Sequence, residues 1–492
     1  MNKTIDCFIL FNDNPSTALF HETLKQNPSV NHIFWLLAPN QATPEGVPAE
    51  SVCHLEGSPT STASMKAIAQ KTEASSILLQ LKDTSVELGY RYLERTSSVL
   101  SDNGAVMLYT DHYSVVNGDT VKHPLIDYQA GSLRDDFGFG SIVLLRSDAF
   151  KEAALTLSET YEYAGWYAVR LALSRKGELF HLNEYLYTES ELDTRKSGER
   201  QFDYVNPNNR KVQIEMEAAV TKHLEAEGAL VDPAQYLTPD FTQGSFPVEA
   251  SVIIPVYNRA KTIRDAVESA LKQEASFTYN VIVIDNHSTD GTTEILNELA
   301  ASNPSLIHLI PSRTDLGIGG CWNWGIYDSH CGRFAIQLDS DDLYSSPQTL
   351  QRIVDTFHEQ KAAMVIGSYR MCDFDLNTLP PGLISHNEWT PENGCNNALR
   401  VNGLGSPRAF FTPLLREVGF PNTSYGEDYA MGLYFCRSYR IGRIYDELYL
   451  CRRWNGNSDA SLSIEKENAN NFYKDRLRTI EFEKRKSVNS NR

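Results

Sequence analysis

The sequence predicts an α/β protein with two successive domains, each built on a largely parallel sheet with flanking helices. Short apolar runs of strand length alternate along the chain with segments long enough for helices or crossovers. The length of 492 residues suits more than one hydrophobic core. Prolines and glycines interrupt regular structure between residues 230 and 248. We therefore expect a first domain over 1–240, a second over 248–465, and a helical, charged tail over 466–492.

The composition argues against a protein whose main partner is nucleic acid, because the formal net charge is −18. No apolar run is long enough for a membrane-spanning helix, and residues 1–30 lack the pattern of a signal peptide. We therefore expect a cytoplasmic protein without a transmembrane segment. The eight cysteines form no CxxC pair, so we expect reduced thiols, with neither zinc nor structural disulfides.

The first half carries four strand-like runs, at residues 5–11, 32–37, 76–81 and 105–109. The segments between them are long enough for helices or crossovers, which favours a parallel sheet. Apolar residues then recur at helical spacing over 212–228, where we predict a helix.

The second half begins with a regular alternation of strand and helix. Residues 251–255 form an apolar run of strand composition, and apolar residues recur at helical spacing over 261–274. A second strand, 281–284, leads directly into Asp285. In open parallel sheets ligands bind at the carboxyl ends of the strands, so we expect Asp285 and Asp339, which follow strands, to lie at a ligand site.

The strand-like run at residues 334–338 ends in three acids, Asp339, Asp341 and Asp342. Neighbouring carboxylates repel one another, and a folded protein keeps them together mainly when a cation or many donors neutralise them. Oxygen ligands on a short loop suit Mg²⁺ or Mn²⁺, which share phosphate oxygens with a substrate. The cluster therefore indicates a metal and diphosphate site. The alternative is a polar loop that caps a helix beginning near Pro347.

Five segments of the second half resemble the motifs of family 2 glycosyltransferases with the GT-A fold. They occur in the family's order over residues 250–465, and five motifs in order are far more specific than any one of them. The resemblance implies a GT-A-type nucleotide-binding sheet in this half. The five segments are 252–258, 283–292, 338–342, 426–428, and 452–454 with Ser458 and Ser461.

The resemblance implies a donor pocket at the first strands of this sheet. Asp285 would hold the base or the ribose of a donor nucleotide, and Asp339 would face the ribose or a metal-bound water. The other residues expected to bind the donor are Pro255, Tyr257, Asn258, Asn323 and Arg453.

The resemblance also implies the catalytic groups. Asp341, together with Asp339, would coordinate a Mn²⁺ or Mg²⁺ ion that bridges the diphosphate, while Asp428 would be the general base, with Glu427 beside it. Breaking a sugar–phosphate bond leaves negative charge that a divalent cation stabilises. The acceptor hydroxyl must lose its proton as it attacks the opposite face of the sugar. Separate acids for the metal and for the acceptor are what an inverting reaction requires.

The expected function is therefore an inverting, metal-dependent glycosyltransferase. Its partners would be a nucleotide-diphosphate sugar as donor and a saccharide or another hydroxyl compound as acceptor. One alternative is a sugar-nucleotide-binding protein without turnover. Another is a sugar-nucleotide nucleotidyltransferase, although such enzymes normally open with a Gly-rich phosphate loop, which residues 255–259 do not form.

Some positions depart from the family pattern. Trp454 stands where many relatives have a metal-binding His, which leaves the ligand set to Asn455, Asn457 or waters. Trp322 stands where a basic residue is common. The insert over 373–405 is expected to shape the acceptor pocket.

The first half has the features of a degenerate GT-A-like copy of the second. Two of its segments align with the acid-bearing segments of the second half but lack their acids, so this half would serve as a scaffold, an acceptor-binding module or a dimer surface. The alternative is chance similarity between two α/β segments. The alignment places Lys82 and Thr84 opposite Asp339 and Asp341, and Gly165 and Trp166 opposite Glu427 and Asp428.

The tail from residue 473 onward is mixed in charge, and we expect a solvated helix. A basic run at 484–486 leaves peripheral contact with an anionic membrane surface as the alternative.

Overall fold

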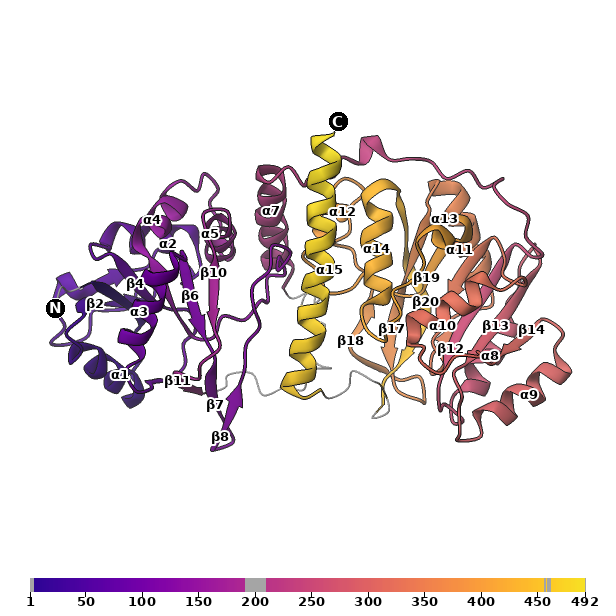
Figure 1. The fold of residues 1–492 in the computed structure, drawn as a ribbon, viewed down its shortest axis with the longest axis horizontal. Coiled ribbons are helices and arrows are strands. Elements are labelled where there is room, and N and C mark those ends of the chain that lie inside the picture. Colours follow the sequence, from indigo (N-terminus) through magenta and orange to yellow (C-terminus); the bar gives the residue numbers. More distant parts are fainter. Residues whose placement is uncertain (1–3, 191–208, 455–456, 458–461, 492) are drawn as a thin grey trace. The chain divides into compact units, whose positions relative to one another are not determined.

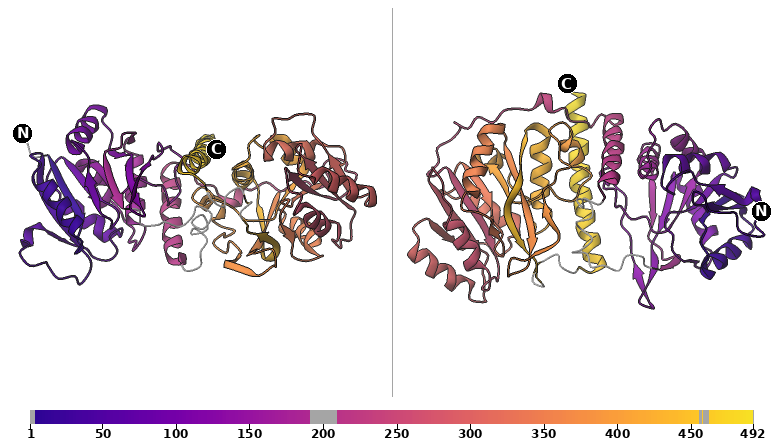
Figure 2. Two further views of the ribbon diagram at one scale, coloured as in Figure 1. Left: turned by 90° about the horizontal axis from the view of Figure 1, so that it is seen from below. Right: turned by 180° about the vertical axis from the view of Figure 1, so that it is seen from behind.

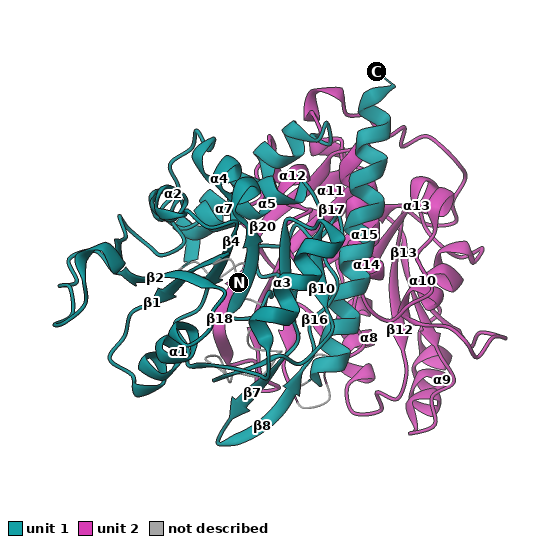
Figure 3. Cartoon of the chain, turned by 60° about the vertical axis from the view of Figure 1, so that its left-hand side comes forward, with its two compact units in different colours: residues 1–200, 207–230, 461–492 teal, residues 201–206, 231–460 magenta. Residues whose placement is uncertain are grey.

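The computed structural model describes residues 4–190, 209–454, 457 and 462–491. The chain divides into two compact units (Figure 3). Unit 1 comprises residues 1–200, 207–230 and 461–492, and unit 2 comprises 201–206 and 231–460. The main break, at residue 231, lies within the proline-rich segment, whereas the C-terminal helix is grouped with unit 1 rather than forming a part of its own.

Unit 1 is built on a seven-stranded sheet in the order β10-β6-β9-β4-β1-β2-β3 (Figure 1). All neighbouring strands are parallel except β9, which runs antiparallel to both β4 and β6. The four strands predicted from the sequence are therefore present, as β1, β2, β4 and β6. The strands are β1 (Ile5–Leu10), β2 (Val30–Leu37), β3 (Val52–His54), β4 (Ser76–Gln80), β6 (Met107–Thr110), β9 (Ile142–Arg146) and β10 (Leu179–Leu182).

Helices cover both faces of this sheet. Because side chains alternate along a strand, Ile77 and Leu79 of β4 point into one core and Leu78 into the other. The first core is closed by α2 (Thr62–Lys71), α4 (Ser147–Leu155) and α5 (Gly165–Ser174), and the second by α1 (Pro15–Lys25) and α3 (Tyr92–Asn103). Such two-sided burial explains why the strands read as continuous apolar runs.

A second, four-stranded sheet of unit 1 has the order β5-β11-β7-β8. It was not predicted, because its strands are short and several of their residues are exposed. The strands are β5 (Val86–Leu88), β7 (His112–Val116), β8 (Asp119–His123) and β11 (Tyr187–Ser190).

The C-terminal helix α15 (Ile464–Ser490) runs beside α7 (Arg210–Ala226), in agreement with two views of the chain (Figures 1 and 2). The ring of Phe482 stacks on His223 with 5.9 Å between centroids, and Lys486 pairs with Glu227 at 2.8 Å. The helix predicted over 212–228 is α7. In contrast to the expected solvated tail, one face of α15 is buried.

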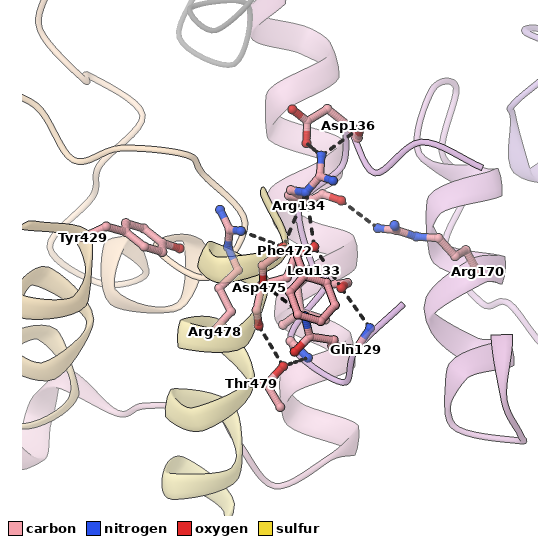
Figure 4. Close-up of polar contacts among 12 residues, drawn as sticks. Gln129, Leu133, Arg134, Asp136, Arg170, Tyr429, Phe472, Asp475, Arg478 and Thr479 are labelled. Atoms are coloured by element: carbon pink, nitrogen blue, oxygen red, sulfur yellow. Dashed lines mark hydrogen bonds and ion pairs between the residues drawn. The ribbon is translucent and has the colours of Figure 1, made fainter. Parts of the chain in front are cut away.

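The buried face of α15 is polar rather than apolar. Asp475 is fully buried and accepts a hydrogen bond from Ser132 Oγ at 3.0 Å (Figure 4). It also forms ion pairs with Arg134 Nε at 3.4 Å and with Arg478 at 2.8 Å. Paired charges of this kind are tolerated in an interior because each satisfies the other.

Unit 2 is built on a nine-stranded sheet in the order β14-β13-β12-β15-β19-β17-β20-β16, with β18 paired to β17. The strands are β12 (Ala250–Val256), β13 (Tyr279–Asp285), β14 (Leu306–Leu309), β15 (Phe334–Gln337), β16 (Leu343–Tyr344), β17 (Met364–Cys372), β18 (Thr378–Ile384), β19 (Arg408–Phe411) and β20 (Ile441–Arg452). The helices are α8 (Ile263–Leu271), α9 (Thr292–Ser302), α10 (Ile318–Tyr327), α11 (Thr349–Gln360), α12 (Gly394–Asn397), α13 (Thr412–Val418) and α14 (Glu427–Ser438).

The two units have the same strand topology. Reading β3-β2-β1-β4-β9-β6-β10 against β14-β13-β12-β15-β19-β17-β20 pairs the strands one to one, in the same chain order. In both units the fifth strand of this list is the antiparallel one. The second sheet of unit 1 also has a counterpart in unit 2. Strands β7 and β11 correspond to the C-terminal halves of β17 and β20, while β5 corresponds to β16 and β8 to β18. This agreement supports the interpretation of unit 1 as a diverged copy, and the α/β class predicted for both halves is confirmed.

Within the described residues, no helix is long and apolar enough to cross a membrane. All eight cysteines are free thiols.

Candidate active site in unit 2

The site lies at the carboxyl ends of the parallel strands β12, β13 and β15. The loop that follows β12 is tied to the loop after β15, because Thr262 Oγ1 donates to the carbonyl of Ser340 at 2.9 Å. It is also tied to the loop after β13, because Asn258 Oδ1 accepts the N–H of Thr289 at 2.8 Å. Three strand ends are thereby held as one surface, as expected for a ligand site in a parallel sheet.

The acidic loop after β15 is held by several donors. Asp339 donates its N–H to Tyr449 Oη at 2.9 Å, and its Oδ1 accepts from Gln337 Nε2 at 2.8 Å. Asp342 is buried, and its Oδ1 accepts the N–H of Arg452 at 2.7 Å. These contacts fix the acids at the end of the strand, as the sequence predicts.

The acids remain crowded in spite of these donors. Burial, with repulsion from Asp341, raises the pKa of Asp339. Burial, with repulsion from Asp339 and Asp341, raises the pKa of Asp342 well above its ordinary value. A divalent cation would relieve this repulsion, so the electrostatics of the loop fit a metal site.

Trp454 contacts the acid that the sequence assigned to the metal. Its Nε1 donates to Asp341 Oδ2 at 3.2 Å, and Asn457 Nδ2 donates to the same oxygen at 3.3 Å. Arg259 Nε lies 3.8 Å from that oxygen. An indole N–H is a donor only, so Trp454 orients Asp341 and does not serve as a ligand. Asn455, Ser458 and Ser461 lie outside the described residues.

The described residues contain no group of three or more His, Cys, Asp and Glu side chains arranged to hold a metal. Mg²⁺ and Mn²⁺ need few protein ligands, because they keep waters and take phosphate oxygens of the substrate. Asp339 and Asp341 therefore fit such an ion together with a diphosphate.

The second acid pair stands at the start of α14. Gly426 precedes the helix with φ of 76°, a conformation that favours glycine, and Glu427 and Asp428 occupy the first turn. Acids are favourable there because of the helix dipole. Asp428 Oδ2 lies 2.6 Å from Arg408 Nη1.

Arg408 joins this pair to the acidic loop. Its own N–H donates to Gln337 Oε1 at 3.1 Å, and the amide of the same glutamine donates to Asp339. The structure thus brings Asp339 and Asp428 to one site through Gln337 and Arg408. Sequence reasoning missed Arg408, because a single arginine at the start of a strand gives no signal of its own.

Glu427 is 9% exposed in the first turn of α14. Burial, with repulsion from Asp428, raises the pKa of Glu427 to about 8. Burial therefore favours the protonated form of Glu427, whereas Asp428 forms the ion pair with Arg408. The two adjacent acids have different environments, which is typical of groups with different roles.

Asp285 differs from its expected place in the donor pocket, because it has no exposed surface. Its oxygens accept from Ser288 N–H at 2.9 Å and from Thr293 Oγ1 at 2.5 Å. Although burial alone would raise the pKa of Asp285, hydrogen bonds with His308, Thr293 and Ser288 hold it below its ordinary value. Asp285 therefore shapes the loop after β13.

The residue after Asp285 also carries a buried polar atom. Asn286 is only partly buried; its Nδ2 donates to the carbonyl of Leu316 at 2.9 Å. Its Oδ1 has no hydrogen-bond partner within the described part of the chain. The sequence offered a signal for Asn286, a polar residue directly after a strand, but Asp285 was chosen.

The remaining donor residues are placed as follows. Tyr257 is 57% exposed on the loop after β12, and Pro255 and Asn258 flank it. Arg453 lies just beyond β20 and donates its N–H to the carbonyl of Cys372 at 2.8 Å. Both ends of the Asn323 amide bind the backbone of Phe420, so this side chain braces the loop before α14.

Two tryptophans lie away from the acids. Trp322 is buried against Phe410 and Phe420 and is a core residue. Trp389, from the insert, lines a cavity of about 790 Å³ with Arg443 and other residues at the start of β20. Because β20 and β15 run in the same direction, this cavity lies at the end of the sheet opposite the acidic loop.

The fold and the site together define an α/β domain with two sets of acids at the carboxyl edge of its sheet. Residues 251–416 match the model of glycosyl transferase family 2. The resemblance drawn from the motifs is confirmed over this segment of unit 2.

Relatives match about a quarter of the chain. An uncharacterized glycosyltransferase of Nostoc sp., alr2836, is 30% identical over 132 residues, which are 27% of this chain and 40% of the relative. The putative glycosyltransferase EpsE of Bacillus subtilis is 31% identical over 121 residues, 24% of this chain and 42% of EpsE. The chain thus spans about two fifths of the length of these relatives.

Solved glycosyltransferase structures are more distant. TarS of S. aureus in complex with UDP is 23% identical, with a TM-score of 0.37 over 47% of this chain and 65% of that chain. The mannosyltransferase PcManGT from Pyrobaculum calidifontis, in complex with GDP-Man and Mn²⁺, is 19% identical, with a TM-score of 0.33 over 49% of this chain and 69% of that chain. At these identities and TM-scores the two structures say nothing of the site residues of this chain.

Proposed function

We propose that unit 2 is the catalytic domain of an inverting, metal-dependent glycosyltransferase. It would move a sugar from a nucleotide-diphosphate sugar to a hydroxyl of an acceptor. The match of residues 251–416 to family 2 supports the reaction class. The geometry of unit 2 supports the roles proposed for its acidic residues.

One observation supports the proposal most strongly. Two sets of acids lie at one edge of the sheet, and the side chain of Arg408 lies between them. Arg408 binds Asp428 at 2.6 Å on one side and connects through Gln337 to Asp339 on the other. One set can therefore serve the diphosphate while the other serves the acceptor. An inverting transfer needs this division, because attack and departure take place on opposite faces of the sugar.

The reaction assigns a role to each set. The acceptor oxygen attacks the anomeric carbon as the bond between that carbon and the diphosphate breaks, and the bonding electrons pass to the diphosphate. Asp428 takes the proton of the acceptor hydroxyl. Arg408 orients Asp428 and lies between the two acid sets.

The donor side uses the acidic loop and the neighbouring strand ends. Asp339 and Asp341 would hold a Mn²⁺ or Mg²⁺ ion, which supplies Lewis-acid stabilisation of the leaving diphosphate. Trp454 and Asn457 each donate a hydrogen bond to Oδ2 of Asp341 and so fix the orientation of its carboxylate. We assign the base contact to Asn286, with Tyr257 and Asn258 beside it and Asp285 as the support of the loop.

The experiment that tests this function is a screen for donor turnover. Common UDP and GDP sugars are incubated with the full chain, with and without Mn²⁺, and the released sugar is followed by NMR. We expect one donor to be cleaved in the presence of Mn²⁺, with inversion at the anomeric carbon. Retention of configuration would refute the inverting mechanism, and tight donor binding without any turnover would favour a binding protein.

A further inference from the structure

Unit 1 contains a cavity of about 280 Å³ beside the N-terminus of α5. Half of its lining residues are aromatic, Val212 and Met216 are aliphatic, and Thr60, Asp135 and Arg170 add polar groups. This composition, apolar with a few polar groups, is typical of small-molecule sites. The aromatic side chains are Phe137, Phe139, Tyr163, Trp166 and Tyr167.

The cavity occupies the place in unit 1 that the proposed catalytic base occupies in unit 2. In unit 1 the N–H of Thr62, at the start of α2, donates to the carbonyl of Tyr161, before α5, at 2.9 Å. In unit 2 the N–H of Gly319, in the first turn of α10, donates to the carbonyl of Thr423, before α14, also at 2.9 Å. Helices α2 and α5 correspond in topology to α10 and α14, and Trp166 stands in α5 where Asp428 stands in α14.

Arg170 is unusual among the residues of the wall, because its side chain is charged and yet only 2% exposed. Its guanidinium lies 4.6 Å from the ring centre of Tyr167 and 5.6 Å from that of Phe139. Its Nη2 donates to the carbonyl of Arg134 at 3.0 Å (Figure 4). Within the part of the chain that the structure describes, its Nε and Nη1 have no hydrogen-bond partner.

These contacts leave the charge of Arg170 only partly compensated. The aromatic faces offset part of the desolvation of the guanidinium, but its remaining N–H groups call for an acceptor. A planar guanidinium matches a carboxylate or a phosphate, which can accept two of its N–H groups together. The complement of the Arg170 guanidinium is therefore an anionic group.

The rest of the wall suits a sugar ring. Trp166 and Tyr163 are only half-buried, so their rings form the rim, whereas Phe137 and Phe139 are buried. A flat aromatic face packs against the apolar C–H face of a sugar, while the hydroxyls point to polar groups or water. A volume of about 280 Å³ lies at the small end of ligand sites and fits one sugar residue.

We propose that this cavity of unit 1 binds an anionic sugar residue, with the ring against Trp166 and the carboxylate or phosphate at Arg170. The choice of a saccharide rests on the proposed function of unit 2, in which such a residue would belong to the acceptor. Unit 1 is then a module that binds the acceptor chain.

The test uses the full chain and four probes: glucuronate, glucose 1-phosphate, glucose and inorganic phosphate. Binding is followed by calorimetry and by tryptophan fluorescence. We expect at least one of the two anionic sugars to bind at least tenfold more tightly than glucose, because a charge-assisted contact is lost with the neutral sugar. Glucuronate and glucose 1-phosphate distinguish a carboxylate from a phosphate ligand.

Two variants locate the site. Trp166→Ala is expected to weaken binding about fivefold through loss of the stacked ring. Arg170→Met is expected to abolish the preference for the anionic sugar over glucose. The matched controls are Tyr90→Ala, an exposed tyrosine of the same unit, and Arg146→Met, a surface arginine paired with Asp148. Should Arg170→Met fail to fold, Trp166→Ala decides alone, because its half-exposed ring lies at the rim.

Several results would overturn the proposal: no binding of any sugar, equal binding of glucose and the anionic sugars, binding of inorganic phosphate as tight as that of glucose 1-phosphate, or unchanged binding by Trp166→Ala. Two variants distinguish failure of this proposal from failure of the function proposed for unit 2. Asp341→Ala should still bind the anionic sugar, and Trp166→Ala should still bind the nucleotide donor.

Discussion

Arg408 is the residue that relates the two acid sets of the site. It pairs with Asp428 at 2.6 Å, and its backbone binds the glutamine that holds Asp339. An acid held in this way can accept a proton from a substrate hydroxyl without a move of the helix that carries it.

The proposed base can be tested without disturbing the donor site. Asp428→Asn keeps the shape of the side chain but removes the group that takes the proton. We expect kcat to fall by about 10² to 10⁴ while the Kd of the donor stays the same. Asp446→Asn is the matched control, since Asp446 is an exposed acid of the same unit. A loss of donor affinity equal to the loss of turnover would argue against the assigned role.

The raised pKa of Glu427 predicts how the stability of the fold changes with pH. Its pKa is raised to about 8, so between about pH 4.5 and pH 8 the folded chain binds a proton that the unfolded chain has lost. This contribution is complete at low pH and is lost as the pH rises. In Glu427→Gln the contribution is absent.

The measurement is urea unfolding of the wild type and of Glu427→Gln in buffers between about pH 5.5 and pH 8.5. This range covers most of the interval over which the two states differ in bound protons. The free energy of unfolding of the variant, relative to the wild type, should increase with pH by up to about 1.4 kcal/mol per pH unit. A difference that does not change with pH would show that Glu427 is ionised throughout.

At the residue scale the acids were predictable and their partners were not. Asp339, Asp341 and Asp428 stand in motifs with a recognisable local sequence. Arg408 and Trp454 reach them only after β19, β20 and α14 are packed, and no local pattern announces such contacts. The family resemblance implied that Asp285 holds the base or the ribose, and its side chain turns inward to Ser288 and Thr293.

At the scale of elements, α15 shows how a charged helix can be part of a core. Its sequence reads as a solvated helix, because its buried face carries charged residues, among them Asp475, Arg478, Glu481 and Arg485. These pair with one another or with Arg134. The strands were predictable from their apolar runs, whereas the pairing of distant charges could not be read from composition.

Asp475→Ala tests the docking of α15 within unit 1. The change leaves Arg134 and Arg478 buried without their shared acid, which should destabilise unit 1 by about 3 kcal/mol or more. Hydrogen–deuterium exchange over residues 464–490 should rise accordingly. Glu483→Ala, an exposed acid of the same helix, is the control. Equal exchange in both variants would mean that the buried acid does not hold the helix.

For the whole molecule, the two units share a strand topology but differ at the loop that carries the acids in unit 2. In unit 1 the place of the metal acids is taken by Lys82, whose Nζ lies 3.3 Å from the buried Glu189. A lysine therefore stands where unit 2 has the first acid of its loop. The internal alignment placed Lys82 opposite Asp339, and the shared strand order supports that alignment.

The binding stoichiometry follows from this difference. We expect one nucleotide per chain and not two, because Lys82 and Thr84 stand where unit 2 has Asp339 and Asp341. Equilibrium dialysis with a nucleoside diphosphate and Mn²⁺ measures this ratio, and Lys82→Ala should leave it unchanged. A ratio of two would mean that unit 1 has kept a donor site.

The central claim is that the acids after β15 bind a divalent cation together with a nucleotide diphosphate. The most direct measurement is calorimetric titration of UDP, GDP and their common sugar conjugates into the wild type and Asp341→Ala, with and without Mn²⁺. We expect one nucleotide to bind the wild type only in the presence of Mn²⁺, and Asp341→Ala to abolish this binding. Binding that is independent of both Mn²⁺ and Asp341, or no binding by the folded wild type, would contradict it.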